Sequence, residues 1–315
     1  YKVAEIWTMG ETLVEIMRTN ENSELYKPDY FKGPYPSGAP AIFIDTAARL
    51  GHKCGIISGV GRDDFGKCIL DRLEKDGVDI SQVLIDPENS TGCAFVTYFE
   101  DGSRKFIFHL GNTPAAAAKA PDEAVLKDTI YFHVMGCSLF AKLEFAQEIL
   151  KTVKMAKKAG AKISFDPNIR KELMGDEQVV EIVNEILSYT NVFLPGLEEL
   201  MMLTGKKTEE SAVRACFEMK NMDILVIKKG SKGSSVYTRK EIISAGVYKI
   251  NAIDSTGAGD SFDGAFICGL IEGRPLSEVI RMASAAGALN TAAFGPMEGD
   301  ISKETINKLT KEEIL

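Results

Sequence analysis

Residues 254–260 combine the residue types that a phosphoryl-transfer site needs. They read Asp-Ser-Thr-Gly-Ala-Gly-Asp, and apolar residues beyond them fall on one face of a predicted helix, at positions 262, 265, 266, 269 and 270. Gly257, Ala258 and Gly259 leave their N–H groups unshielded where that helix begins, and the partial positive charge there attracts anions. Asp260 is expected to be ionised beside them, and its carboxylate suits the deprotonation of a hydroxyl that attacks phosphorus.

A plainer interpretation fits the same segment. Asp254 and Asp260 are also good helix-capping residues, and the two glycines also make an ordinary turn. The segment by itself leaves both interpretations open, so the rest of the chain has to separate them.

Residues 254–266 resemble the C-terminal signature of the ribokinase-like carbohydrate kinases of the phosphofructokinase-B type. Other segments resemble motifs of the same family, in its order and over the whole chain: residues 10–15, 37–51, 59–66, 166–170 and 228–233. The resemblance implies an α/β fold of three layers, α/β/α, with a central, mostly parallel sheet and a small β lid. It also implies an enzyme that transfers the γ-phosphoryl group of ATP to a sugar hydroxyl.

The resemblance assigns roles within this segment and beyond it. It implies Asp260 as the general base and Gly257, Ala258 and Gly259 as the anion site. It places ATP against four residues: Lys228, Gly230, Gly233 and Thr256. A glycine-spaced loop after an apolar strand can approach a nucleotide closely, and lysine attracts its phosphates. The alternative for residues 228–233 is a solvated basic turn.

On the sugar side, the resemblance implies six binding residues: Glu15, Gly38, Ala39, His109, Asn168 and Arg170. Glu15 stands where the family usually has aspartate, and carboxylates accept hydrogen bonds from sugar hydroxyls. Arg170 can clamp a phosphate or an acidic substrate, with an ordinary surface ion pair as the alternative. His109 stands where relatives that act on 2-keto-3-deoxygluconate often have arginine, with a structural histidine as the alternative.

Three positions depart from the family pattern. Ser37 replaces the first glycine of a Gly-Gly pair, Ile42 replaces a sugar-contacting asparagine, and Gly196 replaces the asparagine of an Asn-x-x-Glu motif that supports Mg²⁺. Glu199 ends that motif and is the expected metal residue, with a solvent-facing helical glutamate as the alternative. Mg²⁺ is expected because phosphoryl transfer without it leaves charge uncompensated. The two missing asparagines keep open a silent sugar or nucleotide sensor on the same fold.

The rest of the chain alternates short β-branched or aromatic runs with segments of helical period. Predicted strands are 53–60, 129–135, 162–166, 191–194 and 223–229, and predicted helices are 39–50, 64–76, 143–159, 177–188, 197–204 and 211–219. This alternation predicts a parallel sheet covered on both faces. Asn168 and Arg170 follow one predicted strand, at the sheet edge where such folds gather ligands.

Two segments break the alternation and leave no room for a crossover helix. Residues 11–35 read as extended, and residues 91–110 read as two strands joined by a turn at residues 100–102. We predict that they form a small antiparallel sheet, a lid with strands from 11–37 and 91–112, on a single domain spanning residues 1–315. Relatives often pair through this sheet and an exposed strand is an edge hazard, so a homodimer is expected.

Composition and missing motifs exclude several classes of protein. The 37 Lys and Arg against 45 Asp and Glu, with a net charge of −8, argue against a nucleic-acid partner. No apolar run approaches the ~18 residues of a membrane span, and the first residues show no signal-peptide pattern. The six dispersed cysteines indicate reduced thiols in a cytoplasmic protein. A nicotinamide-dependent dehydrogenase and a Walker A enzyme are excluded because their glycine motifs are missing.

Overall fold

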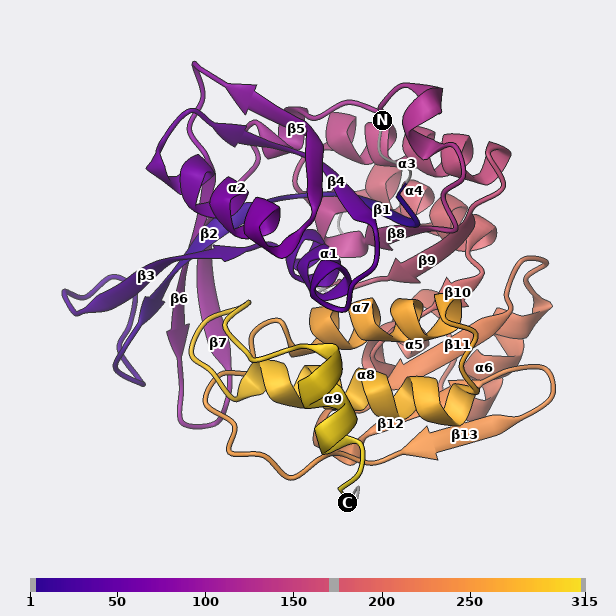
Figure 1. Ribbon diagram of the computed structural model, residues 1–315. Coiled ribbons are helices and arrows are strands. Elements are labelled where there is room, and N and C mark those ends of the chain that lie inside the picture. The colour runs from indigo at the N-terminus through magenta and orange to yellow at the C-terminus, as the bar shows by residue number, and fades with distance from the viewer. Residues whose placement is uncertain (1–3, 170–175, 313–315) are drawn as a thin grey trace.

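A sheet of nine strands runs through the middle of the molecule, with helices on both faces (Figure 1). The computed structural model describes residues 4–169 and 176–312. The strand order is β13-β12-β11-β10-β9-β8-β1-β4-β5, in which β12 and β13 pair antiparallel and the other seven strands run parallel. The bounds are β1 Ile6–Met9, β4 Cys54–Gly61, β5 Asp79–Asp86, β8 Tyr131–Met135, β9 Lys162–Asp166, β10 Val192–Phe193, β11 Ile224–Lys228, β12 Ser234–Tyr237 and β13 Ile242–Ala245.

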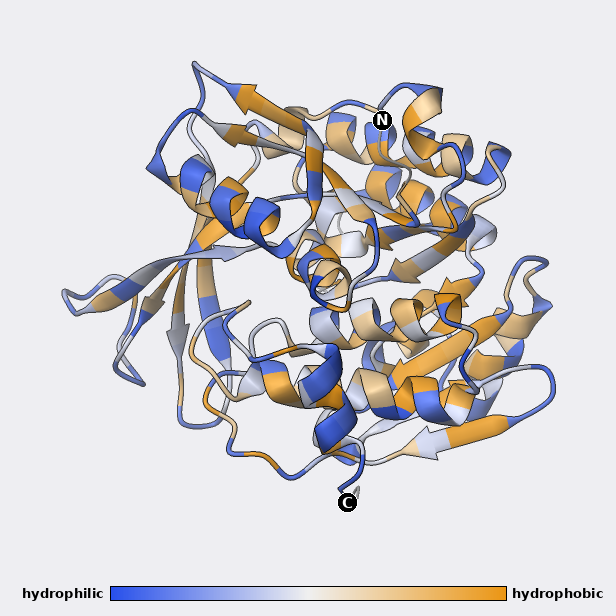
Figure 2. Ribbon diagram, in the orientation of Figure 1, coloured by the Kyte–Doolittle hydropathy of each residue, from blue (hydrophilic) through white to orange (hydrophobic). Residues whose placement is uncertain are grey.

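Alternate strand residues feed two hydrophobic cores, one on each face of the sheet. In β1, Ile6 packs into one core and Trp7 into the other, and in β11 Val226 and Leu225 divide in the same way. Because both faces are covered, the central strands are apolar along most of their length (Figure 2). The first core is covered by α1 Ala39–Arg49, α2 Asp64–Asp76, α7 Ala258–Ile271, α8 Leu276–Thr291 and α9 Lys303–Leu309, and the second by α3 Leu143–Lys158, α4 Glu177–Tyr189, α5 Leu197–Thr204 and α6 Glu209–Glu218. These three layers confirm the predicted fold class.

The helices begin and end close to the predicted residues. Each of the six predicted helices lies within two residues of its observed bounds at both ends. In α2 the reasons are visible: the Asp63 carboxylate accepts from the N–H group of Gly66 at 2.8 Å, and Gly77 ends the helix with a φ of 97°. Helices α8 and α9 and the antiparallel strands β12 and β13 were not among the predicted elements.

A second, four-stranded sheet stands beside the main body in the order β3-β2-β6-β7 (Figure 1). Its strands are β2 Leu13–Arg18, β3 Phe31–Ser37, β6 Gly92–Tyr98 and β7 Arg104–His109, and we call it the lid sheet. Strands β6 and β7 form the predicted hairpin. The prediction of an antiparallel sheet is wrong, because β2 and β6 pair parallel. Both strands continue from parallel strands of the main sheet, β1 and β5, and therefore leave its edge in the same direction.

The remaining secondary structure consists of short helical turns. In the part of the chain that the structure describes, 3₁₀ turns connect the larger elements: η1 Ala115–Ala117, η2 Glu123–Leu126, η3 Gly136–Phe140 and η5 Gly230–Lys232. All six cysteines are free thiols. A search of the described ranges finds no helix with the length and hydropathy to cross a membrane.

Replacing the residue that caps α2 should destabilise the protein measurably. The Asp63 carboxylate also accepts from the N–H and hydroxyl groups of Thr91, at 2.8 and 2.7 Å, and so joins α2 to the start of the lid sheet. We expect Asp63→Ala to lower the free energy of unfolding by about 1–2 kcal/mol, the usual value for a lost cap. Urea unfolding measures it, with Asp71→Ala, exposed on the same helix, as the matched control. Equal losses in the two variants would contradict the capping role.

Candidate active site

A cleft of about 780 Å³ opens between the lid sheet and the carboxyl ends of the parallel strands. One wall comes from the main body: Glu11 follows β1, Asp166 ends β9 and Lys228 ends β11. The other wall includes Arg104 and Phe108 of lid strand β7. Ligands of open α/β sheets gather at this edge.

The segment before α7, residues 254–259, lies in the wall of this cleft, and we call it the anion loop. The Asn290 side-chain amide donates to the carbonyl oxygen of Thr256 at 2.7 Å, and the Asp254 carboxylate accepts from the N–H group of Thr256 at 2.9 Å. Gly257 has a φ of 78°, and a Cβ there would lie 2.6 Å from a carbonyl oxygen of the next loop. Glycine is therefore required at this point of the loop.

The beginning of α7 is left open toward the cleft. No side chain of residues 4–169 or 176–312 caps the helix. Among the described residues, no main-chain oxygen accepts from the N–H groups of Gly257, Gly259 or Asp260, and that of Ala258 reaches the Ser255 oxygen at 3.4 Å. Unpaired N–H groups at a helix N-terminus are a ready site for an anion.

Asp260 lies in the first turn of α7, beside these N–H groups and on the wall of the cleft. Burial raises its pKa to about 8, and the neighbouring Asp166 adds to the rise while Lys228 opposes it. The side-chain amide of Asn168 lies 3.5 Å from its Oδ1 atom. Burial therefore favours the protonated form of Asp260 at neutral pH, whereas the sequence predicted an ionised group.

Three predicted sugar-binding residues line the same cleft: Glu15, Gly38 and Ala39. The Oε1 atom of Glu15 accepts from the Ser37 hydroxyl at 2.8 Å, while its buried Oε2 atom has no hydrogen-bond partner among the residues that the structure describes. Burial raises the pKa of Glu15 to about 7. Gly38 has a φ of 105° and passes so close to Glu11 that a Cβ would lie 2.5 Å from the Glu11 carbonyl oxygen.

Asn168 and Glu199 also face the cleft. The Glu199 carboxylate accepts from the N–H groups of Gly196 and Ile169, at 2.7 and 2.8 Å, which ties α5 to the loop after β9. Burial raises the pKa of Glu199, and Asp166 adds to the effect. Arg170 lies outside the described residues.

Some predicted residues lie elsewhere. His109 does not line this cleft, because alternate residues of β7 point to opposite faces and Arg104 and Phe108 are on the cleft side. Gly230 and Gly233 lie in the turn between β11 and β12 and do not line the cleft. Thr256 and Lys228 do line it.

Sequence reasoning missed the contacts between the lid sheet and the anion loop. Arg104 donates to the Thr256 hydroxyl at 3.1 Å, and the Tyr98 hydroxyl lies 3.2 Å from both Thr256 Oγ1 and Asp254 Oδ1. Tyr98 and Arg104 belong to two adjacent lid strands, and the alternation of side chains along these strands was the signal in the sequence that could have found them. Glu11 was also missed as a wall residue; its carboxylate accepts from Ser138, and burial raises its pKa.

Residues 4–303 match the pfkB family of carbohydrate kinases. The chain belongs to this family. It is similar to the fructokinase of Solanum tuberosum, with 31% identity over 92% of this chain and 90% of that protein. The Escherichia coli fructokinase is 28% identical over 93% and 95%.

Solved structures agree with this pfkB-family membership. A candidate ribokinase II from Escherichia coli, determined in complex with ATP and Mg²⁺, has a TM-score of 0.93 and 39% identity, covering 98% of this chain and all of that one. A Xylella fastidiosa fructokinase has a TM-score of 0.85 at 23% identity, covers 98% of each chain and supports the fold alone. The family membership confirms the prediction of a sugar kinase. Neither the comparisons nor the described residues support a silent sensor.

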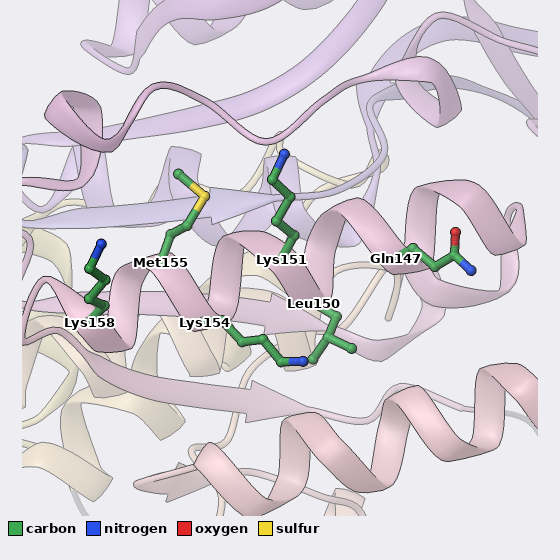
Figure 3. Close-up of a pocket in the computed structure, with 6 residues that line it drawn as sticks. All are labelled: Gln147, Leu150, Lys151, Lys154, Met155 and Lys158. Carbon is green, nitrogen blue, oxygen red and sulfur yellow. The ribbon is translucent and has the colours of Figure 1, made fainter.

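A second hollow, of about 400 Å³, lies along α3 of the pfkB-family fold (Figure 3). Its lining residues are Gln147, Leu150, Lys151, Lys154, Met155 and Lys158. Lys154 pairs with Glu185 at 2.6 Å and Lys158 with Glu123 at 3.0 Å, so these two charges are already matched. The hollow shares no residue with the cleft.

Proposed function

We propose that this chain transfers the γ-phosphoryl group of ATP to a sugar hydroxyl, with Asp260 as the general base. The observation that carries the proposal is the position of Asp260 on the cleft wall beside the open N–H groups of the anion loop. Gly257, Ala258 and Gly259 would hold the migrating phosphoryl group through these N–H groups. Asp260 would accept the proton of the attacking hydroxyl.

The sugar would lie against Glu15, Gly38, Ala39 and Asn168. The unpartnered Oε2 atom of Glu15 is a buried acceptor that a sugar hydroxyl can satisfy. We propose fructose as the sugar, because relatives about 30% identical over nearly the whole chain are named fructokinases.

ATP would lie along the anion loop and the end of β11, with Thr256 and Lys228 in the cleft wall and Gly230 and Gly233 in the following turn. The Escherichia coli structure determined with ATP and Mg²⁺ supports this choice of nucleotide. Bridging hydrogen bonds from Tyr98 and Arg104 to Thr256 hold the lid sheet over this part of the cleft, which would exclude water from the reacting atoms.

The cleft fits a magnesium ion held largely by nucleotide phosphates and water. The described residues contain no group of three or more histidine, cysteine or acidic side chains placed to hold a metal. Mg²⁺ at nucleotide sites usually takes one or two carboxylates, and Glu199 presents one to the cleft. Bound there, the ion would offset the charge of the phosphates.

Removing the proposed base should nearly abolish the reaction. We expect the wild-type chain to release ADP from ATP in the presence of fructose, and Asp260→Asn to lower kcat by about 10²–10⁴-fold, the usual contribution of a general base. A coupled ADP assay measures both, with nucleotide affinity as the control for the fold. Retention of more than about a tenth of wild-type turnover would show that Asp260 is not the base.

The reaction should be faster above neutral pH. Asp260 acts when deprotonated, and its pKa of about 8 keeps most of it protonated below that pH, so kcat/KM should rise about tenfold per unit up to pH 8. Glu15 titrates near pH 7, so Glu15→Gln is the control. This variant should keep the rise of kcat/KM up to pH 8. A flat profile between pH 6 and 8 would contradict the assignment.

We also propose that two copies of the chain pair through the outer face of the lid sheet. This face exposes Phe31 and Ile107, which are 39% and 44% accessible, and both β3 and β7 are edge strands. The Phe31 ring packs at 5.5 Å, edge-on, against Phe95 of the same face. Apolar side chains along an unpaired edge favour association with another strand.

Sedimentation at micromolar concentration tests the pairing. The wild-type chain should sediment as a dimer and Ile107→Lys largely as a monomer, because the charge would be buried between the copies. Ile242→Lys, at an exposed position on edge strand β13, is the matched control and should stay dimeric. A monomeric wild-type chain would overturn this proposal.

A further inference from the structure

Three ionisable side chains meet beside the first turns of α7, and neither the general base nor the sugar wall accounts for them. The Nζ atom of Lys228 lies 2.7 Å from the Oδ2 atom of Asp166 and 3.0 Å from that of Asp263. The aspartate side chains are 4% and 0% exposed, and the lysine side chain 19%. Lys228 and Asp166 end strands β11 and β9, while Asp263 belongs to α7. We call this group the lysine cluster.

The lysine cluster lies next to the anion loop and to the residues around Asp260. Lys228 Nζ lies 3.8 Å from the point where a Cβ on Gly259 would stand. Asp263 follows Asp260 by three residues, so both lie on one side of α7. The Asp166 carboxylate accepts from the N–H group of Asn168 at 3.1 Å, and Asn168 in turn lies against Asp260.

The charges within the cluster balance. Burial raises the pKa of Asp263 well above its usual range, so this residue keeps its proton. Burial also opposes the ionisation of Asp166, but the Lys228 ammonium and a hydrogen bond from Asp263 together hold its pKa below the usual value. One ammonium therefore faces one carboxylate and one neutral acid.

A buried ion pair is weak evidence for stability, because apolar residues of the same size often serve the fold as well. The geometry points to another purpose, and it rests on the proposed function. We propose that Lys228 is a positioning residue for phosphoryl transfer: bound to Asp166 and Asp263, it fixes the first turn of α7 against the ends of β9 and β11, and thereby holds Asp260 and the anion loop in place.

Lys228→Met tests this, since it removes the ammonium and keeps most of the stem. We expect kcat to fall at least tenfold, with KM for fructose and ATP within about threefold of wild type. A rise in KM for ATP at unchanged kcat would show a direct nucleotide ligand and overturn the proposal, as would wild-type kcat. Lys154→Met, at a surface ion pair on α3 (Figure 3), is the matched control and should match wild type.

The pH profile separates positioning from a general loss of structure. Asp260 is faced by Asp166 from β9, Lys228 from β11, Glu11 from the turn after β1, and Arg104 from the lid sheet. Lys228 opposes the rise in the pKa of Asp260, and it also keeps Asp166 ionised. Lys228→Met therefore changes both charges that act on Asp260, so the acid limb of kcat/KM should move by at least half a unit, and an unmoved limb would contradict the proposal.

Two further variants decide the question even where Lys228→Met does not fold. Asp263→Asn keeps a carbonyl oxygen that can accept from Lys228, whereas Asp166→Asn removes the ionised partner of Lys228. We expect Asp263→Asn to be at least fivefold more active than Asp166→Asn, and equal losses would overturn the arrangement. A wild-type chain that phosphorylates no sugar would instead refute the proposed function, so the two failures are distinguishable.

Discussion

The cleft depends on the way helix α7 begins, with its first N–H groups not capped by any described side chain. Most helices satisfy their first N–H groups with a side chain, as α2 does with Asp63. Among the described residues, no side chain caps α7 in this way, and its anion loop is held instead at Thr256, whose carbonyl oxygen accepts from Asn290 and whose N–H group donates to Asp254. Because these hydrogen bonds use Thr256, they leave the N–H groups of Gly257, Gly259 and Asp260 available. Gly257 joins the two parts of the loop in a left-handed conformation.

Burial governs the electrostatics of the cleft more than any single ion pair does. Glu11, Glu15 and Asp260 come from three different elements, and for each of them desolvation is the main cause of a raised pKa. A protonated carboxyl can donate as well as accept a hydrogen bond, which suits a wall that faces hydroxyl groups. The low polarity of these buried surroundings also strengthens the attraction between Lys228 and Asp166, which both keep their charge.

The features that were predicted well from the sequence are those that neighbouring residues in the chain determine. Five of the six predicted helices match within one residue at each end, because apolar spacing and end residues such as Gly77 set their limits. The glycine pattern before Asp260 likewise predicted the position of the anion loop. The parallel pairing of β2 with β6 was missed because it depends on strand directions in the main sheet. Arg104 was missed as a cleft residue because the face that an isolated strand turns toward the cleft is fixed by tertiary packing. The lysine cluster joins three elements distant in sequence, which no local pattern reveals.

The parallel pair in the lid sheet restricts how that sheet can move. Strands β2 and β6 are rooted in β1 and β5, and β4 lies between these two roots in the main sheet. The roots are therefore about 10 Å apart. Strand β3 adds a third attachment, because it ends at Ser37 and α1 begins at Ala39. Any movement of the lid sheet relative to the main body would therefore have to bend these connections together.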